Sequence, residues 1–279
     1  MKRRLATAAI LALLFLFLSA CQVPSPKEAE KSFEQGLKYY KERKYDKAAQ
    51  AFQQAARLKP DFARAHFMLG MSYNMQQRHQ DAVEAFKQAI RLKPDDASAH
   101  NWLGVSYRKL SLFQEAAEAH KQAIRLKPEK HELTFALTQL AEVYQKIGKW
   151  EELAEIYKQT IRLKPETPVL HHNLGTAYLK MGRYQEAAGA FQEAVRLDPK
   201  SSLSFYMLGV TYERLGREQE AVEACKKAVQ LKRDNIPAHL LLGKLYVKQG
   251  DRKSAVQQYK ILQMLSPARA KELYNQIYK

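Results

Sequence analysis

Cysteine is scarce in this chain, whose 279 residues include only Cys21 and Cys225. Two cysteines do not make the disulfide framework that holds small secreted folds together. Glycine-rich phosphate loops are absent, and so are the GxSxG, HExxH and CxxC patterns of catalytic and metal sites. We therefore expect a fold held by packing, with no enzymatic activity, no cofactor and no metal site.

The most apolar segment is short and lies at the N-terminus. Three basic residues at 2–4 precede an apolar run over residues 5–18, and the small residues Ser19 and Ala20 follow. This order is typical of a secretory signal peptide, whereas a membrane span needs about 20 apolar residues. We therefore expect residues 1–20 to be a signal peptide and the protein to be exported.

The tetrad Leu-Ser-Ala-Cys at residues 18–21 resembles the lipobox of bacterial lipoproteins. The resemblance implies cleavage before Cys21 and attachment of fatty acyl chains, such as palmitate, to this cysteine. Two or three chains hold a protein firmly on a bilayer, because each buried CH₂ contributes about 0.8 kcal/mol. Gln22 replaces the aspartate that tends to retain such proteins in the inner membrane, which favours an outer-membrane lipoprotein facing the periplasm. The alternative is an uncleaved anchor with a chance cysteine.

Acidic residues are in the minority, with 29 Asp and Glu against 46 Lys and Arg and a formal charge of +17. Loss of the three basic residues of the signal peptide would leave +14. In a cytosolic protein this balance would suggest nucleic acid as a partner, but export argues against that. Anionic lipid headgroups, anionic glycans and an acidic protein remain as counterparts, and a generally solvated basic surface is the alternative.

Proline marks an internal repeat after residue 28. Prolines at 60, 94 and 128 are 34 residues apart, and the series continues at 165, 199 and 267. Most follow a similar tail, such as Arg-Leu-Lys at residues 57–59. A fixed period of this length is typical of stacked supersecondary units. With each proline at position 32, the repeats begin at residues 29, 63, 97, 134, 168, 202 and 236.

Small and large residues recur at fixed positions of this repeat. Position 8 is glycine except for Ala141, position 11 is always tyrosine, position 20 is alanine except for Leu153, and position 24 is mostly aromatic. Small residues let two helices approach, large ones fill the space around the contact, and proline ends the second helix. The pattern resembles the tetratricopeptide repeat (TPR) family over residues 29–267. The resemblance implies an all-α fold, a right-handed solenoid of antiparallel helix pairs.

The predicted organisation is a signal peptide, 1–20, a lipidated cysteine with a short tether, 21–28, seven repeats and a capping helix, 268–279. The repeats span residues 29–62, 63–96, 97–133, 134–167, 168–201, 202–235 and 236–267. Three extra residues around 129–133 make the fourth repeat irregular, so we expect its helices to pack wider and to bend the stack. An apolar stripe of Leu273, Tyr274, Ile277 and Tyr278 is expected to cover the last open face.

The histidines do not form a metal site in this pattern. His66, His100, His171 and His239 all occupy position 4 of their repeats. Equivalent residues on successive helices lie about 8–10 Å or more apart, too far to share a metal ion, so we expect structural or surface roles. Cys225 occupies position 24, where the family packs an aromatic ring, so we expect a buried, inert thiol.

In the TPR family the first helix of each repeat lines a groove through positions 2, 5, 9, 12 and 13. The residues that we expect to contact a partner there are Phe33, Leu37, Tyr40, Phe67, Met71, Met75, Asn101, Arg108, Lys109, Glu142, His172 and Tyr206. Exposed Met and aromatic side chains suit adaptable capture of a peptide or helix. The alternative is that some of these residues pack between repeats.

Position 13 is basic in six of the seven repeats, at Lys41, Lys109, Lys146, Lys180, Arg214 and Lys248. Two explanations remain open: cations are stabilised at helix C-termini by the macrodipole, or they form a basic ridge that guides an acidic ligand. Phe33 and Leu37 stand where some TPR modules carry the Lys and Asn that grip an acidic C-terminal peptide. That mode of binding is therefore not expected.

Together these features predict a membrane-anchored, protein-binding scaffold or adaptor for assembly of an envelope complex, such as pilus or secretion machinery. The chain looks most like TPR lipoproteins that act as pilotins for the type IV pilus secretin, because a lipobox is followed almost directly by regular repeats. The alternative is an envelope structural protein associated with peptidoglycan or another anionic glycan, which the positive charge would favour.

Overall fold

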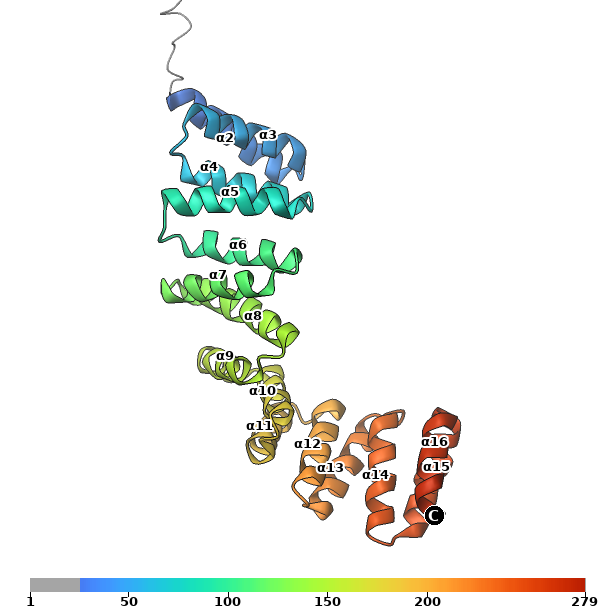
Figure 1. The fold of residues 1–279 in the computed structure, drawn as a ribbon. Helices are drawn as coiled ribbons and strands as arrows, with labels where there is room; N and C mark the ends of the chain where they lie inside the picture. Colours follow the sequence, from blue (N-terminus) through green and yellow to red (C-terminus); the bar gives the residue numbers. More distant parts are fainter. Residues whose placement is uncertain (1–25, 279) are drawn as a thin grey trace, which may run out of the picture. The chain divides into compact units, whose positions relative to one another are not determined.

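A computed structural model describes residues 26–278, so the predicted signal peptide, Cys21 and most of the tether lie outside the described residues. Within residues 26–278 the chain forms fifteen α-helices joined by short turns, without a β-strand (Figure 1). The predicted all-α fold is confirmed. The chain divides into two compact units, Met1–Ala136 (unit 1) and Leu137–Lys279 (unit 2). None of the helices over residues 26–278 is both long enough and apolar enough to cross a bilayer.

Unit 1 consists of helical hairpins that follow one another along the chain. The pairs are α2 (Pro26–Lys41) with α3 (Tyr45–Leu58), α4 (Ala63–Met75) with α5 (His79–Leu92), and α6 (Ala97–Lys109) with α7 (Phe113–Arg125). Each second helix also packs on the next first helix, α3 on α4 and α5 on α6. Figure 1 shows the turns between these repeats on one side of the unit and the turns within them on the other.

Unit 2 continues the same arrangement to the C-terminus. It contains α9 (Trp150–Leu163), α10 (Pro168–Lys180), α11 (Tyr184–Leu197), α12 (Ser202–Arg214), α13 (Glu218–Leu231), α14 (Ile236–Lys248), α15 (Arg252–Leu265) and α16 (Pro267–Ile277). The pairs α10–α11, α12–α13 and α14–α15 form hairpins, and the first helix α12 also touches both α10 and α14. These three first helices therefore line one continuous surface of unit 2.

The irregular fourth repeat begins with a lengthened helix. Helix α8 (Lys130–Ile147) has 18 residues, whereas the first helices α4, α6, α10, α12 and α14 have 13 each. It begins ahead of the predicted repeat start at Thr134, so the extra residues around 129–133 extend this helix. The predicted wider packing and bend of the stack stay predictions.

The close contact predicted between the two helices of a repeat is present. A Cβ atom on Gly36 would lie 2.6 Å from Cε1 of Phe52, and one on Gly70 would lie 2.8 Å from Cε1 of Phe86. Both rings are fully buried. Real Cβ atoms do not approach other atoms so closely, so glycine at position 8 is what lets the ring at position 24 pack against the first helix.

The turn inside each repeat needs one residue with a left-handed backbone, at position 15. Four repeats use glycine, with φ between 71° and 76°, and three use Arg43, Gln77 and Ser111, with φ of 59°, 61° and 62°. This conformation costs a residue with a Cβ atom about 1–2 kcal/mol. The position was not among those predicted, although glycines at 148, 182, 216 and 250 repeat with the period of the chain.

The predicted capping helix is α16, and its apolar stripe contacts the last repeat. Leu273 is fully buried against Gly243, and Ile277 is 7% exposed. Tyr274 and Tyr278 stay 44% and 49% exposed, with their ring centroids 4.5 Å apart. Both tyrosines still contact α15, since the ring centroids of Tyr274 and Tyr259 lie 5.6 Å apart and the Arg252 guanidinium lies 4.7 Å from the Tyr278 ring centroid. Leu273 and Ile277 are therefore the buried part of the cap, and the two tyrosines form its exposed edge.

Candidate functional site

The first helices of unit 1 present apolar side chains that the core does not fully enclose. Met75, the last residue of α4, is 49% exposed. The other members are partly buried: Leu37, Tyr40, Phe67 and Met71. We call these five residues the apolar patch of unit 1. Burial raises the pKa of Tyr40 above its ordinary value, so its hydroxyl stays neutral and the patch carries no charge of its own at neutral pH.

Phe33 and Asn101, which the sequence placed among the partner contacts, are each only 2% exposed. Both occupy position 5, and this position packs on position 24 of the same repeat. The ring centroids of Phe33 and Phe52 lie 5.4 Å apart, and Asn101 Oδ1 accepts a hydrogen bond from His120 Nδ1 at 3.2 Å. The expectation for these two residues is corrected, because their side chains belong to the packing within the repeat and leave no surface for a partner.

Position 5 makes the same contact where it is partly exposed. The ring centroids of Phe67 and Phe86 lie 5.7 Å apart, and those of His172 and Phe191 lie 5.4 Å apart, both near-perpendicular. Burial lowers the pKa of His172, and burial raises that of Tyr206, which is also at position 5. Only the outer edges of these side chains face solvent, and they are uncharged at neutral pH.

The polar candidates in the middle of the chain differ in exposure. Arg108 is partly buried, whereas Lys109 and Glu142 are exposed. Burial, together with the nearby positive charge of Arg108, lowers the pKa of the core residue His120 to about 4. Lys109 and Glu142 are the members of this group that a partner could reach directly.

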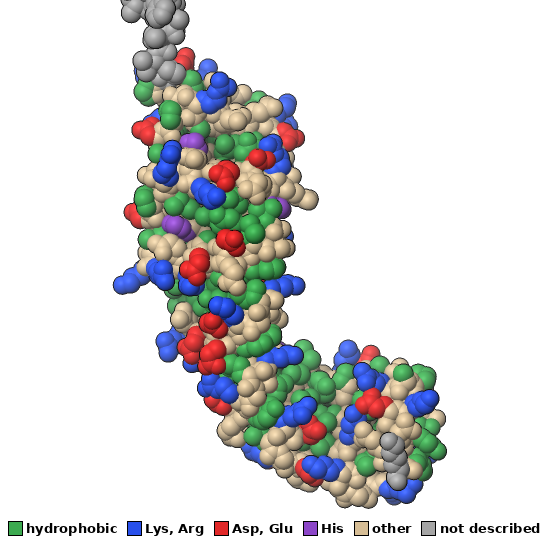
Figure 2. Space-filling view, viewed as in Figure 1, with side chains coloured by type: hydrophobic (Ala, Val, Ile, Leu, Met, Phe, Trp, Pro, Cys, Tyr) green, Lys and Arg blue, Asp and Glu red, His purple; other side chains and the backbone are tan. Residues whose placement is uncertain are grey.

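The basic residues at position 13 are all exposed, at or next to the last residue of their first helices. Lys248 Nζ lies 2.6 Å from Glu218, and Arg214 Nε lies 3.8 Å from Glu213. Over residues 26–278 the structure shows no ion pair for Lys41, Lys109, Lys146 or Lys180. On the visible face of unit 1, Figure 2 shows acidic and basic side chains interspersed with hydrophobic ones. The cations at position 13 are therefore exposed charges at the ends of the first helices, and Arg214 and Lys248 each have an acidic neighbour.

The structural role predicted for the histidines at position 4 is confirmed. Nε2 of His66, His100 and His171 donates a hydrogen bond to the carbonyl of the preceding repeat's proline, at 3.2, 3.0 and 2.9 Å. His239 makes the same bond at 2.9 Å to Arg233, which replaces that proline. Each bond ties a first helix to the turn before it. The described part of the chain contains no group of three His, Cys, Asp or Glu that could hold a metal ion.

Cys225 lies at position 24 with its side chain fully buried against Gly209. Burial raises the pKa of its thiol to about 12. A thiol needs its ionised form to react as a nucleophile. The predicted burial is confirmed, and the protonated thiol fills the space that a phenylalanine ring occupies in other repeats.

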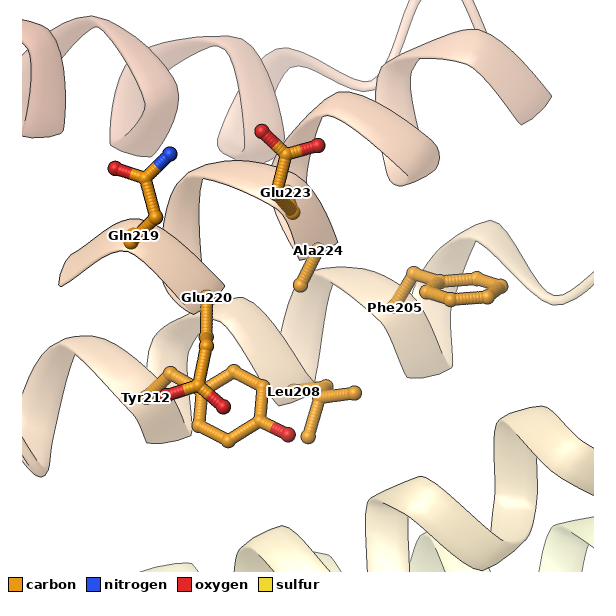
Figure 3. Close-up of a pocket in the computed structure, with 7 residues that line it drawn as sticks. All are labelled: Phe205, Leu208, Tyr212, Gln219, Glu220, Glu223 and Ala224. Carbon is orange, nitrogen blue, oxygen red and sulfur yellow. The ribbon is translucent and has the colours of Figure 1, made fainter. Parts of the chain in front are cut away.

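Two equivalent cavities, which were not predicted, lie between the first and second helices of repeats 3 and 6. The cavity in repeat 6 measures about 330 Å³, with Phe205, Leu208 and Tyr212 of α12 and Glu220, Glu223 and Ala224 of α13 around it (Figure 3). Both carboxylates are paired, Glu220 with Arg217 and Glu223 with Lys226. The same repeat positions line the cavity in repeat 3, including Leu103, Tyr107, Glu115 and Glu118. These cavities offer an apolar floor and a charged rim.

The comparisons agree with this architecture. Three tetratricopeptide repeat family models match the chain, over residues 33–97, 76–131 and 172–236, over 136–200, and over 212–277. No curated protein matches it.

Similar solved structures are TPR proteins with low sequence identity. One from Cytophaga hutchinsonii has a TM-score of 0.71 at 14% identity, covering 88% of this chain and 100% of that one. YrrB, a TPR protein with an unusual peptide-binding site, has a TM-score of 0.59 at 21% identity, covering 68% and 96%. MamA of Desulfovibrio magneticus RS-1 has a TM-score of 0.55 at 21% identity, covering 62% and 96%. These structures share the fold, and with the family models and the repeated helix contacts they show that the chain belongs to the tetratricopeptide repeat family.

Proposed function

We propose that this chain is a lipid-anchored adaptor of the bacterial cell envelope that binds a segment of a partner protein on its first helices. The observation that carries the proposal is the apolar patch of unit 1. TPR arrays are in general protein-binding scaffolds, and YrrB is a member with a peptide-binding site. Binding energy would come from burial of the patch, since a fully buried Met or Phe side chain contributes about 1.5–3 kcal/mol.

Met75 offers the sharpest test of partner binding, because its exposed side chain can be changed without disturbing the core. Met75→Glu places a charge in the patch and is expected to weaken capture of the native partner by at least about tenfold. The matched control is Met264→Glu, since Met264 is 81% exposed and lies on the second helix α15 of unit 2. Pull-downs from cross-linked envelopes measure both variants. Equal capture by Met75→Glu and the wild type would remove the patch from the proposal.

Anchoring is supported by the lipobox-like residues 18–21. We expect the wild-type chain to incorporate a labelled palmitate analogue and to fractionate with the outer membrane. Cys21→Ala is expected to lose both properties, because the thiol is the attachment point. A Cys21→Ala variant that stays fully membrane-bound would contradict the lipoprotein assignment, independently of what the first helices bind.

At the level of a particular machine, we propose a pilotin-type role in assembly of the type IV pilus secretin. The support is the short interval between the lipobox and α2, the four residues 22–25, which would span at most about 14 Å. Affinity capture of the anchored protein should recover secretin or pilus components. Recovery of a different envelope complex would keep the adaptor role and reject this machine.

The exposed row of cations at position 13 favours a second candidate, association with peptidoglycan or another anionic glycan. Binding that depends on charge weakens steeply as salt rises, whereas burial of the apolar patch persists. Sedimentation with isolated peptidoglycan at low and high salt separates the two. Salt-sensitive sedimentation that Met75→Glu leaves unchanged would support the glycan function.

A further inference from the structure

The first helices of unit 2 carry a row of exposed apolar side chains that the packing of the repeats does not use. Val169 and Leu203 are 56% and 58% exposed, and Pro237 is exposed as well. All three stand at position 2, the second residue of α10, α12 and α14. The corresponding position is charged or polar in repeats 1 to 3, with Glu, Arg and Ser, and is Phe135 in repeat 4, whose ring centroid lies 5.7 Å from that of Trp102. An apolar residue at position 2 is therefore not a requirement of the fold.

The opposite ends of the same three helices carry cations. Lys180, Arg214 and Lys248 are the last residues of α10, α12 and α14, and all are exposed. At a rise of 1.5 Å per residue, the apolar row and these cations are about 16 Å apart along each helix. The ion pairs of Arg214 with Glu213 and of Lys248 with Glu218 involve partly exposed side chains. Such pairs are weak, so carboxylates of a ligand can replace them.

Between the two rows α12 is apolar and partly accessible, whereas α10 carries His172 and Thr176 there and α14 carries Lys244. Tyr206 and Val210 of α12 lie between Leu203 and Arg214 in the sequence of the helix, and both are partly buried. Because α12 touches both α10 and α14, the apolar row, the middle of α12 and the cations form one surface. Its two sides have opposite chemistry, which restricts what can bind there.

We propose that this surface binds an amphipathic α-helix of the partner protein, lying across α10, α12 and α14. Its apolar stripe would face Val169, Leu203 and Pro237, and an acidic stripe would face the cations at position 13. This assignment rests on the proposed adaptor function and names the chemistry of the partner segment. A helix with side chains is about 10–12 Å wide, so it lies between rows about 16 Å apart, and the long Lys and Arg side chains at position 13 span the remaining distance.

The spacing of the repeats sets the register of the ligand. Neighbouring helices lie about 10 Å apart, which corresponds to seven residues of an α-helix but to three residues of an extended strand. The bound helix therefore presents one apolar residue to each repeat at seven-residue intervals. Three repeats require a segment of about 20 residues, and helix capture in an apolar groove is an established mode of recognition.

The experiment titrates a fluorescein-labelled synthetic helix of about 21 residues into the full-length protein in neutral phosphatidylcholine nanodiscs. The peptide carries Leu at every seventh position with Glu directly after each, and fluorescence anisotropy reports binding. Two comparison peptides have the same length, one with a central proline that prevents a continuous helix and one with Lys in place of Glu. Both are expected to bind at least about tenfold more weakly than the acidic helix.

Variants of the protein test the two rows separately. Leu203→Ser is expected to weaken binding about tenfold, and Lys180→Glu is expected to weaken it several-fold and to reduce its dependence on salt. Both residues are exposed, so the fold is kept. Met264→Ser, on α15, is the matched control and should bind like the wild type.

Three results would overturn the inference: no binding of the acidic helix, equal binding of the proline peptide, or no effect of Leu203→Ser. Equal binding of the proline peptide would assign the surface to an extended segment. Partner capture that depends on Met75 in unit 1, together with no binding of this peptide, would refute the inference and leave the proposed function standing.

Discussion

Mild acid is expected to destabilise repeat 3 through one buried imidazole. His120 occupies position 24 with its side chain fully buried. Its Nδ1 donates a hydrogen bond to Asn101, and its Nε2 is buried with no hydrogen-bond partner among the described residues. Protonation would add a charge and a second N–H group where no acceptor lies. The folded protein therefore favours neutral His120.

The size of the effect follows from the pKa of His120. Burial, followed by the charge of Arg108, lowers this pKa from 6.5 to about 4. As the pH falls, the unfolded chain takes up the proton near pH 6.5 and the folded chain only near pH 4, so the free energy of unfolding decreases across this window. The full difference corresponds to about 3 kcal/mol. About 2 kcal/mol of it is lost between pH 7.5 and pH 5.

The matched variant is the double substitution Asn101→Phe and His120→Phe, which copies the Phe67–Phe86 pair of repeat 2. It removes the titrating group without leaving the Asn101 amide unpaired. Neighbouring repeats unfold partly independently, so hydrogen exchange of α6 and α7 should be measured beside urea unfolding, at both pH values. The wild type should lose about 2 kcal/mol more than the double variant on acidification. An equal pH dependence of the two proteins would refute the assignment to His120.

Three further predictions concern the turns, the thiol and the cap. Gln77→Gly is expected to raise the free energy of unfolding by about 1 kcal/mol, and Gly182→Ala is expected to lower it by about as much. Both residues have a positive φ, and no atom lies within 4 Å of a Cβ placed on Gly182, so the backbone conformation alone sets the effect. Urea unfolding measures both variants, and no change in either would contradict this. The pKa of Cys225 is raised to about 12, so roughly one thiol in ten thousand is ionised at pH 8. In a Cys21→Ala variant, Cys225 should therefore not react with Ellman's reagent at pH 8 until urea unfolds the protein. Leu273→Ala should lower the free energy of unfolding by about 3 kcal/mol, as measured by urea unfolding. Tyr274→Ala is the control, and a smaller decrease for Leu273→Ala than for Tyr274→Ala would reject the capping contact.

The fold could be predicted because the same residue pattern recurs in each repeat. Glycine at position 8 and a ring at position 24 define one contact, and Gly36 with Phe52 shows it directly. The fully buried Cys225 follows from the same rule, since its position alone indicates burial. A pattern that recurs at a fixed period is informative even where one copy departs from it.

The candidate surface was harder to predict, because it depends on how far each first helix is rotated. Position 5 lies on the edge of the helix that faces the second helix, so Phe33 and Asn101 became core residues while Phe67 kept an exposed edge. A helical period of 3.6 residues places positions 2, 5, 9, 12 and 13 on one broad face, but it does not say where on that face burial ends. The exposure of Val169 and Leu203 is visible only in the folded chain.

Position 2 shows which residue types the fold tolerates, and this can be compared with the residue types that a ligand would require. The fold accepts Glu, Arg and Ser there in unit 1, so packing does not select the residue type. Val169 and Leu203 are each more than half exposed, and such apolar side chains favour association with another apolar surface. The proposed ligand would cover these side chains. Because cations end the same helices, that ligand must be apolar on one side and acidic on the other, which is the property that the Leu203→Ser and Lys180→Glu variants test separately.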